Sequence, residues 1–82
     1  MADGEKRFDR IDLLCARRAQ DGLKSYGCLD LKNDRRDFLV ETQEEILDGI
    51  NYTKWAMARG EISIVEGATI VHFLKGIYRM LI

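Results

Sequence analysis

Apolar residues recur at helical spacing in three stretches of the chain. The first stretch follows Asp9, a suitable N-cap, and stops at Gly27, a residue typical of helix ends. Between them the apolar positions repeat every three or four residues, which is the period of one helix face. These positions are Ile11, Leu14, Cys15, Ala19, Leu23 and Tyr26.

Two further stretches show the same period and their own start and stop signals. The second follows Asp34, which we expect to be its N-cap, and ends at Gly60. The third follows Ser63 and Glu66, whose spacing is that of a capping box. The pattern predicts an all-α chain with helices over about 10–26, 35–59 and 64–82.

The third predicted helix is apolar over more than half of its circumference. A helix of this kind is normally covered on two sides, and a chain of 82 residues most simply supplies the second cover from another copy. We therefore expect a homodimer or homotetramer, formed through residues 64–82 and the apolar face of 35–59. Residues 1–82 are expected to form one domain, in which the polar residues 1–7 are a disordered tail.

Composition and charge fit a folded helical protein rather than a nucleic-acid-binding one. The chain has no proline, 33% charged residues and a net charge of −1. Residues 1–40 carry nine Lys or Arg against eight Asp or Glu, and residues 41–82 carry four against six, so neither half predicts a general nucleic-acid surface. Cys15 and Cys28 form no CxxC motif, and neither an apolar leader nor a membrane-length apolar run is present. We expect reduced thiols and a cytoplasmic location.

Four carboxylates lie within two turns of the second predicted helix: Glu41, Glu44, Glu45 and Asp48. At about 100° per residue, their directions fall within an arc of roughly 100°. No basic residue stands four positions after any of them, so local ion pairs do not balance the charge. Either solvent screens this face, as on most amphipathic helices, or a cation compensates it. Carboxylate oxygens suit Mg²⁺ or Mn²⁺.

Other residues extend this candidate site. Arg18 projects from the apolar arc of the first helix, where a buried guanidinium needs an anionic partner, and the four carboxylates are the candidate. If the site holds a nucleotide, Arg18 and Lys24 are expected to neutralise phosphate charge. Asn51, Tyr52 and Trp55 follow one turn after the carboxylates and are expected to contact the substrate and its base.

The run Glu44-Glu45-Ile46-Leu47-Asp48-Gly49-Ile50-Asn51-Tyr52 resembles the second metal-binding motif of the MazG-like all-α nucleoside triphosphate pyrophosphohydrolases. Lys24-Ser25-Tyr26-Gly27 and Asp34-Arg35-Arg36-Asp37-Phe38 are similar to segments of small MazG-like proteins from phages and prophages. The resemblance implies a helical dimer or tetramer that uses Mg²⁺ to split nucleotides into the monophosphate and pyrophosphate. It also implies that Glu45 and Asp48 ligate metal and are catalytic, with Asn51 near the substrate.

The chain departs from that family in one respect. The family has an EExxE motif on the preceding helix, where this chain has only Asp9, Asp12 and Asp21. Glu41 and Glu44, or a partner subunit, would have to complete the site. The alternative is a non-enzymatic helical homo-oligomer of phage or prophage origin, whose acidic face is solvated or binds a basic partner.

Overall fold

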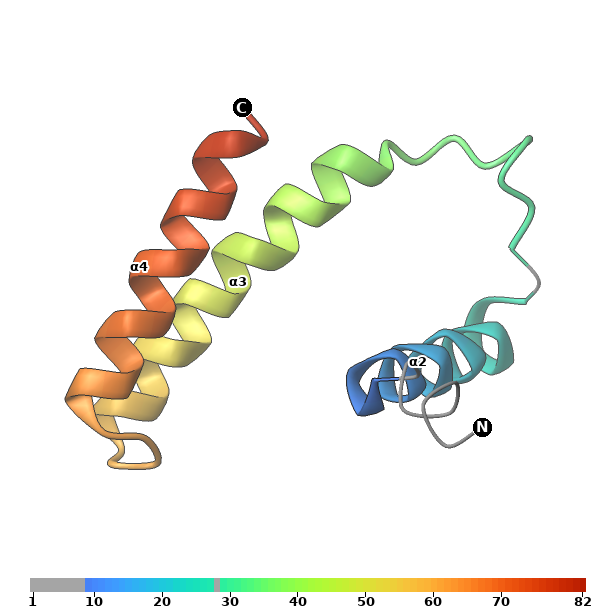
Figure 1. Cartoon of the computed structure of the whole chain (residues 1–82). Coiled ribbons are helices and arrows are strands. Elements are labelled where there is room, and N and C mark those ends of the chain that lie inside the picture. The colour runs from blue at the N-terminus through green and yellow to red at the C-terminus, as the bar shows by residue number, and fades with distance from the viewer. Residues whose placement is uncertain (1–8, 28) are drawn as a thin grey trace, which may run out of the picture. The chain divides into compact units, whose positions relative to one another are not determined.

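The computed structural model describes residues 9–27 and 29–82, and in these residues it contains three α-helices and no β-strand. The helices are α2 (Arg10–Tyr26), α3 (Phe38–Ala58) and α4 (Ile64–Met80) (Figure 1). This confirms the all-α prediction. The chain forms two compact units, of which unit 1 is Met1–Asp34 and unit 2 is Arg35–Ile82. The expected single domain stays a prediction, and the expected tail, 1–7, lies outside the described residues.

Helix α2 has the predicted bounds and the predicted caps. The Asp9 carboxylate accepts a hydrogen bond from the backbone N–H of Ile11 at 3.0 Å. At the other end, Gly27 adopts φ 86°, and its N–H donates to the carbonyl of Leu23. Only glycine takes this left-handed conformation without strain, which explains why the helix ends there. The apolar stripe of α2 is exposed at Ile11, Leu14, Cys15, Ala19 and Leu23.

Helix α3 begins three residues later than the sequence predicted. Asp37, not Asp34, is the N-cap: its backbone is extended, and its carboxylate accepts hydrogen bonds from the N–H groups of Leu39 and Val40 at 3.0 and 3.2 Å. The first helical hydrogen bond then runs from the Glu41 N–H to the Asp37 carbonyl. A helix starting at Arg35 would leave the Asp37 carboxylate inside the first turn and lose both capping bonds.

Replacing Asp37 by alanine is expected to lower the free energy of unfolding by about 1 kcal/mol, because two N–H groups at the start of α3 lose their acceptor. Asp37→Asn keeps an acceptor oxygen and is expected to retain most of that stability. Urea unfolding followed by circular dichroism measures both variants. If Asp37→Ala unfolds at the same urea concentration as the wild-type protein, Asp37 does not cap α3.

The turn between α3 and α4 is fixed by local hydrogen bonds. Gly60, with φ 75°, donates its N–H to the carbonyl of Met57, and Glu61 donates to the carbonyl of Ala56. This pair of bonds is the Schellman motif, which ends α3 at Ala58 rather than at residue 59. Ser63 then caps α4 by accepting from the Glu66 N–H at 3.1 Å, as predicted. Helix α4 ends at Met80, two residues before the expected end.

Helices α3 and α4 pack side by side as a hairpin (Figure 1). Ile50 of α3 and Val71 of α4, each 8% exposed, are the buried apolar side chains among the described residues. Gly67 is also buried, against the side chain of Met57. At the open end of the hairpin the Gln43 amide donates to the Leu81 carbonyl at 2.6 Å, which satisfies an acceptor that α4 leaves free.

A second apolar face of α4 has no cover within unit 2. We call it the outer face, and its residues follow one another at spacings of three, four and three: Ile70, Phe73, Ile77 and Met80. Phe73 is 64% exposed and Met80 is 83% exposed. Helix α3 therefore covers one side of α4, and cover of the second side stays a prediction. No helix in the described part of the chain has the length and apolarity needed to cross a membrane.

Candidate functional site

The four predicted metal ligands all lie on α3, and all are exposed. We call Glu41, Glu44, Glu45 and Asp48 the acidic face. Because α3 turns by about 100° per residue, their directions differ from that of the buried Ile50 by roughly 120° to 180°. The acidic face is thus directed away from the packing with α4.

No cation of the protein balances the acidic face within the described residues. Arg59 and Glu61 form an ion pair at 3.4 Å in the turn, and none of the four carboxylates has such a partner there. Among those same residues, no three His, Cys, Asp or Glu side chains come close enough to hold one metal ion.

Two aromatic side chains adjoin the acidic face. Tyr52 and Trp55 contact each other edge to face, with ring centroids 5.5 Å apart and an interplanar angle of 86°. They are 67% and 58% exposed, so each ring is accessible to a ligand or another chain. Spacing along the helix puts them on the same side of α3 as Asp48.

The predicted phosphate contacts lie in the other unit. Arg18 and Lys24 both belong to α2, and both are exposed within unit 1. Arg18 was expected to be buried and to require an anionic partner; its exposure removes that requirement, because water solvates the guanidinium. Their positions relative to α3 stay a prediction. Cys15 is an exposed free thiol, and Cys28 lies outside the described residues.

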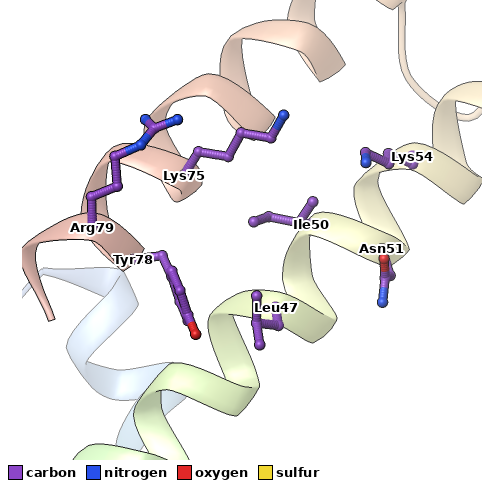
Figure 2. Close-up of a pocket in the computed structure, with 7 residues that line it drawn as sticks. All are labelled: Leu47, Ile50, Asn51, Lys54, Lys75, Tyr78 and Arg79. Atoms are coloured by element: carbon purple, nitrogen blue, oxygen red, sulfur yellow. The ribbon is translucent and has the colours of Figure 1, made fainter. Parts of the chain in front are cut away.

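The structure reveals a concave site that sequence reasoning missed. A groove of about 470 Å³ lies between α3 and α4, and we call it the basic groove (Figure 2). In Figure 2, Ile50 of α3 and Tyr78 of α4 extend into the space between the two helices, and Leu47 is on α3 one turn before Ile50. The groove is lined by Leu47, Ile50, Asn51, Lys54, Lys75, Tyr78 and Arg79.

One sequence signal did point to the basic groove. Lys75 and Arg79 are one turn apart on α4, on a polar strip that also contains His72. A depression of about 280 Å³, lined in part by His72, shares Lys54 and Lys75 with the basic groove. The missing information was the pairing of the two helices, which places Lys54 of α3 opposite this strip. Asn51, predicted to lie near a substrate, is one of the lining residues.

Comparison of the chain with protein-family models, curated proteins and solved structures found no match. The MazG-like resemblance therefore rests on the quoted motifs alone, and it enters the function as a proposal.

Proposed function

We propose that the chain is a subunit of a cytoplasmic, homo-oligomeric MazG-like protein that binds a nucleoside triphosphate with Mg²⁺ or Mn²⁺ at the acidic face. The proposed reaction releases the nucleoside monophosphate and pyrophosphate. One observation carries this proposal: four exposed carboxylates, without an ion-pair partner among residues 9–27 and 29–82, share a face of α3 with an exposed pair of aromatic rings.

The donor set fits Mg²⁺ held together with a substrate. Proteins usually bind Mg²⁺ through one or two carboxylates, and waters and substrate phosphates fill the other positions. Glu45 and Asp48, three residues apart on α3, would supply the protein ligands, with Glu41 and Glu44 adding negative potential or a second pair. Mg²⁺ would contribute neutralisation of phosphate charge and activation of a water for attack on phosphorus.

The chain's own residues would then position the nucleotide. Asn51 would donate or accept a hydrogen bond with the substrate, and Tyr52 or Trp55 would stack on the base. Arg18 and Lys24 would balance phosphate charge, supplied from the same subunit or from a neighbour. A partner subunit is also the proposed source of the second acidic helix that the family motif requires.

Calorimetric titration with Mg²⁺ or Mn²⁺, followed by assay of pyrophosphate release from a panel of dNTPs, tests this function. Asp48→Asn is expected to weaken metal binding at least tenfold, because a charge-assisted contact is worth about 1.5–3 kcal/mol. Glu61→Gln removes an equal charge outside the acidic face and is expected to change neither quantity. Absence of both metal binding and pyrophosphate release in the wild-type protein would exclude the enzyme.

The outer face of α4 favours a second candidate, a non-enzymatic helical interaction protein of phage or prophage origin. Its residues 70, 73, 77 and 80 have the three-four spacing with which helices pack against one another. Self-association is common to both candidates. Pyrophosphate release distinguishes them, because the second candidate self-associates but does not release pyrophosphate.

A further inference from the structure

The basic groove brings together three basic side chains that no described carboxylate pairs with. Lys54, Lys75 and Arg79 line it, and none of them forms an ion pair within the described residues. Lys75 and Arg79 are also one turn apart on α4, an arrangement that is unfavourable by a few tenths of a kcal/mol. An anion bound between these three side chains would offset the repulsion.

The lining also provides a surface for an apolar ring. Leu47, Ile50 and Tyr78 line the groove together with the basic side chains (Figure 2). Asn51 adds an amide that both donates and accepts hydrogen bonds. Mainly apolar walls with a few polar groups are typical of small-molecule sites of roughly 300–1,000 Å³, and the groove of about 470 Å³ falls within that range.

We propose that the basic groove binds a nucleoside polyphosphate, with its phosphates between Lys54, Lys75 and Arg79. The base lies against Leu47, Ile50 and Tyr78. This inference rests on the proposed function for the identity of the ligand, whereas the charge and shape of the groove stand independently of it. Lys54 and Lys75 line both neighbouring depressions, so the phosphates occupy the middle of the concave surface.

Two larger anionic occupants fit this surface less well. A nucleic-acid strand would bring a long row of phosphates past α3, whose acidic face repels them. The acidic α3 of a second copy is the other candidate, and a helix is about 10 Å wide. The groove volume of about 470 Å³ has room for roughly one turn of such a helix. A short phosphate chain attached to one ring matches both the size and the charge.

The position of Asn51 links the groove to the acidic face. Asn51 lines the groove, and it is three residues after Asp48 on α3. By its direction on the helix, about 100° from Ile50 and about 60° from Asp48, Asn51 lies between the groove and the acidic face. In this arrangement the groove would bind the nucleotide, and carboxylates of the acidic face would hold an ion that neutralises phosphate charge.

The test measures binding of dATP to the full chain in the presence of EDTA, by calorimetry and by amide NMR spectra. Binding without metal is expected, with the largest amide shifts at Asn51, Lys54, Lys75 and Arg79. Lys75→Gln and Arg79→Gln are each expected to weaken dATP binding about tenfold, as loss of one charged hydrogen bond predicts. Arg59→Gln, the charge-matched control outside the groove, is expected to bind dATP as the wild-type protein does. Lys54→Gln tests whether the α3 wall of the groove also contributes to dATP binding.

Different experimental results would reject the nucleotide-binding groove and the proposed enzymatic function. Metal-free dATP binding that the groove variants weaken, without Mg²⁺ binding or pyrophosphate release, would support the groove and reject the enzyme. Binding that requires Mg²⁺, shifts only Glu44 and Asp48, and is unchanged by Lys75→Gln would overturn the groove. Tighter binding of a single-stranded oligonucleotide than of dATP would also overturn it, as would loss of self-association in ligand-free Lys75→Gln.

Discussion

Phe73→Glu is expected to convert a self-associated protein into monomers. Phe73 lies within the outer face of α4 and is 64% exposed in the single chain. If a second copy covers this face, the substitution places a carboxylate in an apolar interface, where an unpaired charge costs several kcal/mol. We expect the dissociation constant to rise at least 100-fold, equivalent to about 2.7 kcal/mol. Sedimentation equilibrium over a range of protein concentrations measures it.

Ala58→Glu is the matched control for this experiment. It adds the same charge at an exposed position, the last residue of α3, and is expected to leave the association unchanged. A melting temperature that rises with protein concentration in the wild type, but not in Phe73→Glu, would show that association contributes to folding stability. A wild-type chain that is monomeric at every concentration would reject the homo-oligomer in both candidate functions.

The proposed self-association would explain how so small a core suffices. Within the described residues, Ile50 and Val71 are the apolar side chains that reach burial, and the hairpin of α3 and α4 leaves much of its apolar surface exposed. Small domains that lack a sufficient core are normally stabilised by oligomerisation, disulfides or metals. If the chain self-associates, the outer face would provide the first of these routes, because its three-four spacing allows side chains of two helices to interlock.

The helices were predictable from sequence because their signals are local. Asp9, Gly27, Ser63 and Gly60 fix helix ends through contacts within a few residues, and the structure contains each of those contacts. The start of α3 was predicted wrongly because Asp34 and Asp37 are both good caps. Sequence alone does not show which carboxylate reaches the free N–H groups; the extended backbone of Asp37 decides it.

The candidate site was only partly predictable, for a different physical reason. The period of one helix was enough to place the acidic residues together on α3. The basic groove requires knowledge of which faces of α3 and α4 meet, because Lys54 lies on one helix and Lys75 and Arg79 on the other. That pairing depends on how Ile50, Val71, Gly67 and Met57 pack, and no local pattern reports it.

The packing of α3 against α4 at Gly67 predicts a large loss of stability for Gly67→Val. A Cβ added at Gly67 would overlap the Cγ and Sδ atoms of Met57, and Gly67 is buried. Overfilling a packed site costs about 1–3 kcal/mol, and the two methyl groups of valine should bring the loss to about 3 kcal/mol. Urea unfolding at one fixed protein concentration measures it.

Gly76→Val is the matched control, because it makes the same change inside the same helix where nothing lies within 4 Å of an added Cβ. Valine and glycine differ by only a few tenths of a kcal/mol in helix propensity, so Gly76→Val is expected to be nearly neutral. If the loss at Gly67 comes from Met57, Met57→Ala should make room for the valine. The loss in the free energy of unfolding of the double variant should then be smaller than the sum of the two single losses, by about 1–2 kcal/mol. Additive losses would mean that Gly67→Val acts through the backbone of α4 instead, and that α3 does not approach α4 at this glycine.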